Sequence, residues 1–298
     1  MEYTVSTFNH RQAELDSKWK RYLYGTGKGI VQDGIPDYAH YVKSCPRILY
    51  LLKEANDESN SNWSLRDYIL QEDGACQRGY TWNNLYRWTV GIRHLREQWP
   101  LERISPPSPK EKLEVFHTIG TINVKKTTGS SSANAKELWA SVNDPVCQTL
   151  LKEQIELCDP SLIICCGTTQ YLRDGIYAGK PLKWKMTANG ISYCQYSKER
   201  CIVDYMHPGA HKRVKFLYDN LMAALTCNQC ADTTDNIADA IGLRFLITIF
   251  FLKNNLRQQD AQQRKDRKQY QGNQETIAIS RRFTRSSSSS LSLPVRQL

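Results

Sequence analysis

Short apolar runs alternate along this chain with longer stretches in which apolar side chains recur at helical spacing. An apolar run of about six residues, bounded by polar or turn-forming residues, is typical of a strand buried on both faces of a parallel sheet. Three runs fit this description, at residues 47–52, 119–124 and 161–166. Two shorter strand-like runs follow, at residues 190–197 and 200–205.

Helical periodicity covers much of the sequence between these runs, at residues 63–99, 136–157 and 214–225. Strands that alternate with helices predict an α/β fold of three αβα layers, with helices on both faces of a central, mainly parallel sheet. Ligands bind such sheets in the crevice at the carboxyl ends of the strands. Polar clusters follow Leu52, Val124 and Tyr205, so we expect a functional site at this edge.

Composition divides the chain into three parts. Residues 1–45 are interpreted as a helical, aromatic-rich lead-in, and residues 46–252 as the α/β domain. Residues 253–298 are rich in Gln, Arg, Lys and Ser, and they carry too few apolar groups to repay the entropy of ordering. They predict a disordered basic tail. Residues 237–252 form the most apolar stretch, which is short for a bilayer span and contains two charged residues, so we interpret it as a buried helix.

Charge points to a partner that carries phosphates. The net charge is +10 and the isoelectric point about 9.1, which fits DNA, although an anionic membrane surface attracts the same charge. Ten basic and three acidic residues lie in residues 253–298, so the rest of the chain has a net charge of only +3. The tail therefore either raises the affinity for DNA in a salt-dependent way or keeps the protein in solution.

The N-terminal residues indicate a reducing compartment, and this decides how the cysteines are interpreted. The first residues lack the apolar stretch of a signal peptide, so we expect a cytoplasmic protein whose ten cysteines are thiols. Only Cys227 and Cys230 have a metal-like spacing, and one such pair is half of a zinc site. We therefore expect no metal site. We also expect no membrane association and no obligate protein partner.

Four motifs follow one another in the order of the predicted strands. They are Lys53-Glu-Ala-Asn-Asp57, Thr121-Ile-Asn-Val-Lys-Lys126, Asp159-Pro-Ser-Leu-Ile-Ile-Cys-Cys-Gly167 and Asp204-Tyr-Met-His-Pro-Gly209. Their order and spacing resemble the uracil-DNA glycosylase superfamily, especially its branch with a G-E-A-P-G first motif, over about residues 46 to 225. The resemblance implies that family's fold, with DNA as the partner.

The departures from the family pattern narrow what the resemblance implies. Lys53 stands where the family has glycine, and Asn56 stands where it has proline, which puts uracil specificity in question. The same branch holds an iron–sulfur cluster through four cysteines, and the paired cysteines that it uses are missing here. We therefore expect no cofactor.

The resemblance also implies roles for individual side chains. A glycosylase flips its base out of the duplex, and cleavage creates positive charge on the sugar and negative charge on the base. Glu54, Asn56 and Asp57 are the candidates for placing the water and favouring the cationic sugar. His207 is the candidate hydrogen-bond donor to the departing base, for which a neutral imidazole suffices.

Base recognition and DNA contact involve further residues. Asn123 matches the family's base-reading asparagine, because its amide can both donate and accept hydrogen bonds; a structural strand residue is the alternative. Tyr80 and Trp82 are candidates for stacking on the base, although aromatic residues at helical spacing also fill cores. The candidates for contacts to DNA phosphates are Lys125, Lys126, His211, Lys212 and Arg213.

Two functions therefore follow from the sequence. The first is a monofunctional DNA glycosylase that uses water and leaves an abasic site, because no lysine is placed for Schiff-base chemistry. Its base is uracil, in DNA repair, or a modified base such as a hypermodified cytosine in phage DNA, in antiviral defence. The alternative is a member of the fold that binds nucleic acid without catalysis, and it would bind flipped bases without cleaving them.

Overall fold

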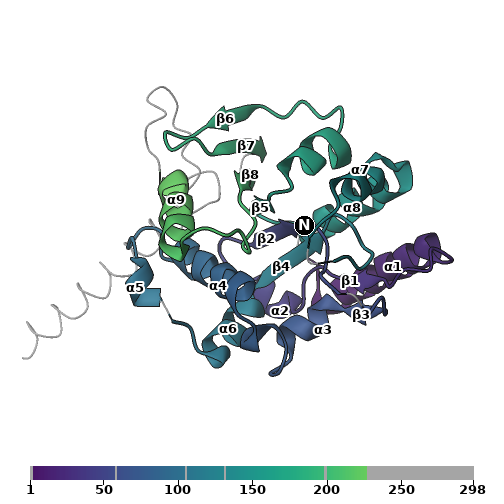
Figure 1. The fold of residues 1–298 in the computed structure, drawn as a ribbon, viewed down its shortest axis with the longest axis horizontal. Coiled ribbons are helices and arrows are strands. Elements are labelled where there is room, and N and C mark those ends of the chain that lie inside the picture. The colour runs from purple at the N-terminus through teal and green to yellow at the C-terminus, as the bar shows by residue number, and fades with distance from the viewer. Residues whose placement is uncertain (1–2, 58, 105, 131, 198–199, 227–298) are drawn as a thin grey trace, which may run out of the picture. The chain divides into compact units, whose positions relative to one another are not determined.

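A six-stranded sheet with helices on both faces organises the computed structural model, which describes residues 3–226 apart from residues 58, 105, 131 and 198–199 (Figure 1). In sheet order the strands are β4 (Ile119–Asn123), β2 (Ile48–Leu52), β5 (Leu162–Cys166), β8 (Arg200–Tyr205), β7 (Ser192–Ser197) and β6 (Trp184–Met186). The first four are parallel, and the last two pair antiparallel at one side. The predicted α/β class with a mostly parallel sheet is confirmed.

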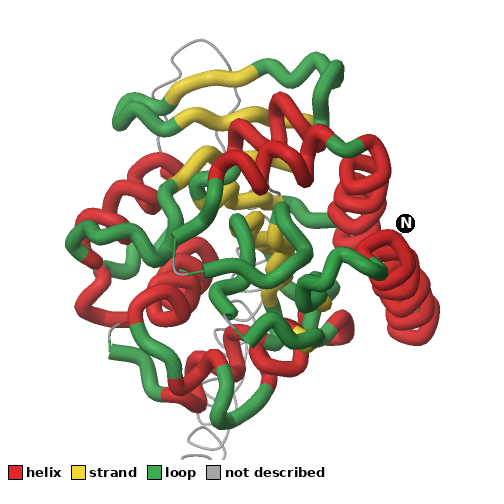
Figure 2. The backbone as a smooth tube through the Cα atoms, turned by 45° about the vertical axis from the view of Figure 1, so that its right-hand side comes forward, coloured by secondary structure: helices red, strands yellow, loops and turns green. Residues whose placement is uncertain are grey.

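The central strands are buried on both faces, as their continuous apolar runs predict. In β2, Ile48, Tyr50 and Leu52 point into one hydrophobic cluster, while Leu49 and Leu51 point into the other. This alternation follows from the two-residue period of a strand. Each face therefore needs its own cover of helices, and Figures 1 and 2 show the strands lying between two groups of helices.

One hydrophobic cluster lies between the sheet and the helices that follow β2 and β8. These elements are α3 (Leu65–Leu70), the 3₁₀-helical segment η1 (Ala75–Gln77), α4 (Tyr80–Arg93), α5 (Leu101–Ile104), α6 (Pro109–Phe116) and α9 (Val214–Thr226). Trp88 of α4 is fully buried here and packs edge-on against Tyr205 of β8. Residues 63–99, expected to be helical, also contain the short strand β3 (Trp63–Ser64), which pairs with β1 (Val31–Gln32).

The other face is covered by helices from the N-terminal part and from the middle of the described chain. They are α1 (Val5–Leu23), α2 (Tyr38–Tyr41), α7 (Ala135–Asn143), α8 (Pro145–Cys158) and the π-helical segment η2 (Tyr171–Ile176). Phe8, Leu15 and Trp19 of α1 join the same cluster as Leu49 and Leu51 of the central strand. The predicted lead-in thus supplies side chains to the core of the predicted α/β domain.

The predicted helix over residues 136–157 is two helices. Helix α7 ends at Asn143, and Asp144 then caps α8 by accepting hydrogen bonds of 2.9 Å from the backbone N–H groups of Val146 and Cys147. Pro145 follows as the first residue of α8, a position that tolerates its missing N–H. An Asp-Pro pair therefore ends one helix and begins the next.

Several predictions concern residues outside the described part of the chain. These are the cysteine pair at residues 227 and 230, the apolar stretch at residues 237–252 and the basic tail at residues 253–298. Among the helices within residues 3–226, none combines the length and apolar character needed to cross a membrane.

A buried carboxylate holds the segment before α2 against the outer side of β4. Asp33 is 1% exposed and accepts hydrogen bonds from the Lys126 ammonium (2.5 Å), the Gln154 amide (2.9 Å) and the Asn123 backbone N–H (2.7 Å). The ammonium of Lys126 is itself only 2% exposed. A buried charge pair of this kind is strongly destabilised when one partner is removed.

We expect Asp33→Ala to lower the free energy of unfolding by about 3–5 kcal/mol, because it leaves the Lys126 ammonium buried without a counter-charge. Urea denaturation measures the change. Asp174→Ala is the matched control, since Asp174 pairs with Arg173 where both side chains are about half exposed, and its loss should cost about 0–1 kcal/mol. Equal losses in the two variants would contradict a stabilising role for Asp33.

Candidate functional site

A pocket of about 710 Å³ lies at the carboxyl ends of β2, β4 and β8, where the polar clusters were expected. The structure brings seven of the predicted site residues together in its lining, from four separate parts of the chain. They are Glu54, Asn56, Asp57, Tyr80, Trp82, Asn123 and His207. The parallel order β4-β2-β5-β8 accounts for this, because it brings the ends of the strands to one edge.

Two backbone hydrogen bonds join the loop after β2 to the loop after β4. The Ala55 carbonyl accepts a hydrogen bond from Gly129 N–H (2.9 Å), and the Asp57 N–H donates one to the Gly129 carbonyl (3.0 Å). A Cβ atom on residue 129 would lie 2.3 Å from the carboxyl carbon of Glu54. A side chain at residue 129 would therefore displace the Glu54 carboxylate, against which the backbone of Gly129 packs directly.

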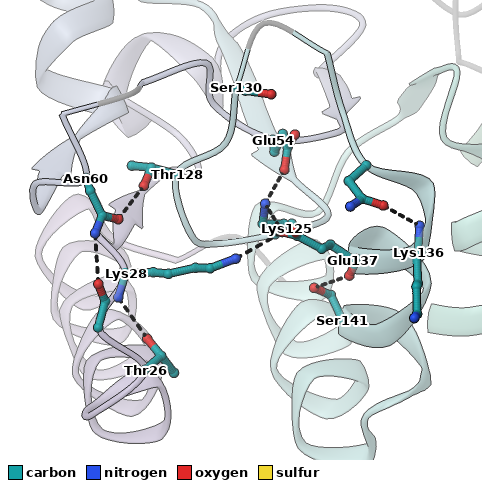
Figure 3. A network of polar contacts seen from close by, with 12 residues as sticks. Thr26, Lys28, Glu54, Asn60, Lys125, Thr128, Ser130, Lys136, Glu137 and Ser141 are labelled. Carbon is teal, nitrogen blue, oxygen red and sulfur yellow. Dashed lines mark hydrogen bonds and ion pairs between the residues drawn. The ribbon is translucent and has the colours of Figure 1, made fainter.

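The Glu54 carboxylate is fixed by a chain of alternating charges, shown in Figure 3. It pairs with the Lys125 ammonium, which also contacts Glu137 at 2.7 Å, and Glu137 contacts Lys28 at 3.0 Å. The Glu54 and Lys125 side chains are 4% and 6% exposed. Hydrogen bonds from Lys125 and Lys28 lower the pKa of Glu137 to about 2. The pocket thus contains a carboxylate that is anchored in one orientation by a lysine.

Two lysines that the sequence assigned to DNA phosphates have internal partners instead. Lys125 binds Glu54 and Glu137, and Lys126 binds Asp33 in the core. Both side chains are almost fully buried, so neither is available to a phosphate in this structure. The assignment of these two residues to phosphate binding is wrong for this conformation, because carboxylates distant in sequence already neutralise them.

Asn123 lines the pocket, and one of its side-chain donors lacks a partner in the described part of the chain. Its side chain is 1% exposed, and its backbone N–H is fixed by Asp33. Among the described residues, the side-chain Nδ2 has no hydrogen-bond partner, although it is buried. An amide left unpaired in the interior costs free energy, so such a group is normally explained by a missing partner. A ligand in the pocket would provide one.

His207 is a neutral hydrogen-bond donor by virtue of its surroundings. Its Nδ1 accepts a hydrogen bond of 3.0 Å from the Gly209 N–H, so the ring proton of the neutral form lies on Nε2. Burial, assisted by the positive charge of Lys53, lowers the pKa of His207 from 6.5 to about 4. At neutral pH the ring therefore carries one proton on Nε2, available to a ligand.

Helix α4 holds the His-Pro turn in position. The Asn84 amide donates a hydrogen bond of 2.7 Å to the Pro208 carbonyl, and Arg87 donates one of 3.2 Å to the Asn84 amide oxygen. Both residues are buried. A Cβ atom on Gly209 would lie 2.9 Å from the Thr81 hydroxyl, so the turn approaches the start of the helix closely.

Aromatic side chains form one wall of the pocket. Trp63, Tyr68 and Trp82 line it, and successive ring centroids lie 5.8 Å and 6.2 Å apart, with Phe116 behind Trp82 at 5.5 Å. Trp63 and Tyr68 were not singled out from the sequence. The signal available was the density of aromatic residues between positions 63 and 99, which does not by itself reveal which rings face a cavity.

The predicted DNA-contacting segment lies beside the pocket rather than in it. His211, Lys212 and Arg213 are exposed and precede α9. Tyr80, which lines the pocket and is 41% exposed, donates its hydroxyl proton to the Lys212 carbonyl. This contact places three exposed basic side chains next to the rim.

Comparison with protein-family models and with curated proteins finds no match to this chain. We therefore infer the function from the geometry of the pocket.

The environment of His207 predicts its titration. We expect NMR of labelled protein to show a neutral ring protonated on Nε2 from pH 8 down to about 5. The variant Lys53→Met should raise the pKa of His207 but leave it below 6.5, because burial is the larger cause of the shift. As the pH falls, His207 of the unfolded chain is protonated near pH 6.5, whereas His207 of the folded protein is protonated only near pH 4. Folding stability should therefore decrease between these two pH values. A ring that titrates near 6.5 in the folded protein would contradict the assignment.

Proposed function

We propose that this protein hydrolyses the N-glycosidic bond of a base flipped out of DNA, and that its fold is that of the uracil-DNA glycosylase superfamily. The observation that carries the proposal is the unpaired Asn123 amide, which shares a pocket with the neutral His207 imidazole. Both groups suit the polar edge of a base. The aromatic wall of Trp63, Tyr68 and Trp82 suits its flat face.

The reaction needs groups that stabilise separated charge. As the bond between C1′ and the base nitrogen breaks, the base takes the electron pair and the sugar becomes cationic. His207 would donate its Nε2 hydrogen bond to the departing base anion. The anchored Glu54 carboxylate would favour the cationic sugar, and Asn56 and Asp57 would position the water that adds to C1′. The proton released by this water then neutralises the base.

Contacts to the phosphate backbone would come from exposed groups at the rim. His211, Lys212 and Arg213 lie next to Tyr80, and Arg78 lines the pocket and is exposed. Phosphate contacts orient a protein on DNA without reading its sequence. The base is therefore selected inside the pocket, where uracil and modified pyrimidines both remain candidates.

One observation favours a second candidate, a protein that binds a flipped base without cleaving it. The Glu54 carboxylate is paired with the Lys125 ammonium, which weakens its attraction for a cationic sugar. Asn123, His207 and the aromatic wall serve binding equally well in either case.

A glycosylase assay tests the proposal. Duplex and single-stranded DNAs that contain uracil, hypoxanthine, 5-hydroxymethylcytosine or its glucosylated form are incubated with protein and then cleaved with alkali at abasic sites. We expect cleavage of one base, with kcat lowered about 10²–10³-fold in His207→Ala and in Asn123→Ala, because each removes a donor to developing negative charge. Glu54→Gln should also lower kcat.

Matched controls are available on the surface. His10→Ala removes an exposed histidine that pairs with Glu14, and Glu153→Gln removes an exposed carboxylate that pairs with Lys18. Both should leave kcat unchanged. DNA binding without an abasic product from any substrate would reject the glycosylase and support the binding protein. If His207→Ala and Asn123→Ala both kept full activity and full DNA binding, both candidate functions would be rejected.

A further inference from the structure

A second cluster of polar side chains lies near the start of β4, whereas the pocket lies at the end of this strand. Asp37 precedes α2, His40 lies in the last turn of that helix, and His117 ends α6 just before β4 begins. The pocket lies where β4 ends, so the two groups are separated by the length of the strand. The proposed function does not use this cluster.

The three side chains converge on one point. The Nδ1 atoms of His40 and His117 lie 2.6 Å and 2.9 Å from the same carboxylate oxygen of Asp37, Oδ2. The three potential ligand atoms all lie within 4.8 Å of one another, and the imidazole ring centroids are 5.4 Å apart at an interplanar angle of 60°. Two imidazoles therefore direct nitrogen atoms at a shared acceptor from separate elements.

We propose that Asp37, His40 and His117 bind a divalent transition-metal ion, with zinc as the ion that the ligand set fits best. Two imidazoles and one carboxylate, with the remaining position open to water, form a common three-residue zinc set. Tetrahedral bonds of about 2.0–2.1 Å would place the ligand atoms about 3.3 Å apart. The observed separations require only small side-chain movements to reach this spacing.

The surroundings allow these movements and leave the ligands available. The side chain of His40 is 64% exposed, and those of His117 and Asp37 are 33% and 21% exposed, so an ion can enter from solvent. Asp37 uses its other oxygen, Oδ1, to cap α2 by accepting a hydrogen bond from the His40 N–H (3.2 Å). The cap and the metal ligand are thus different atoms of one carboxylate.

The choice of ion follows from the nitrogen ligands. Magnesium and calcium prefer oxygen ligands, whereas imidazole suits zinc, copper and nickel. Each ring would bind the ion through Nδ1 and carry its proton on Nε2, and because only a neutral imidazole is a ligand, binding would weaken at low pH. The ion would connect α2 to the junction of α6 and β4, which makes its main effect a gain in stability of this region.

Calorimetry on the full chain with zinc, followed by cobalt absorption spectroscopy, tests the proposal. We expect one zinc ion to bind with an affinity that falls at least tenfold in His40→Ala and in His117→Ala, and to raise the melting temperature of the parent protein only. His40→Ala alters an exposed side chain, and circular dichroism checks that the variant is folded. Magnesium should neither bind nor stabilise.

Two controls separate this cluster from other ligands in the chain. His10→Ala removes an exposed histidine outside the cluster and should not change zinc affinity. Cobalt bound by nitrogen and oxygen should show visible d–d bands without a thiolate charge-transfer band, and Cys227→Ser with Cys230→Ser should leave these bands in place. A thiolate band, unchanged affinity in both cluster variants or no zinc binding to the parent protein would overturn the proposal.

Discussion

The buried ion pair between Asp33 and Lys126 is the constraint on which the arrangement of the pocket depends. Asp33 reaches the core from the segment before α2, and it fixes the backbone at the last residue of β4 as well as the lysine beyond it. Burying two charges is expensive unless each is paired and hydrogen-bonded, and Gln154 supplies a further donor. The position of Asn123 is thereby set by electrostatics in addition to strand pairing.

A second buried ion pair, between Lys125 and Glu54, lies at the pocket. Lys125 and Lys126 are adjacent and point to different carboxylates, Glu54 at the pocket and Asp33 in the core. Both lysines follow the end of β4, where the chain bends, and their side chains go to opposite sides. A pair of consecutive lysines therefore links the two polar clusters, and Gly129 allows the following backbone to close over Glu54.

The pocket was largely predictable from sequence, because the ends of parallel strands meet at one edge. Glu54, Asn123 and His207 each follow or end a strand that its apolar run reveals. The roles of the lysines were not predictable in this way, since their partners lie 71 and 93 residues away. A basic residue beside a predicted site looks the same in sequence whether it faces a phosphate or an internal carboxylate.

The unpaired amide of Asn123 also has a consequence for selectivity. Within the described residues the Asn123 Nδ2 donor has no partner, and a buried donor that stays unpaired costs on the order of 1–3 kcal/mol. A ligand that offers an acceptor there removes this cost, whereas an apolar analogue of the same shape leaves it in place. Discrimination between the two therefore comes from a penalty built into the unliganded protein, and it works by rejecting molecules that lack the matching atom.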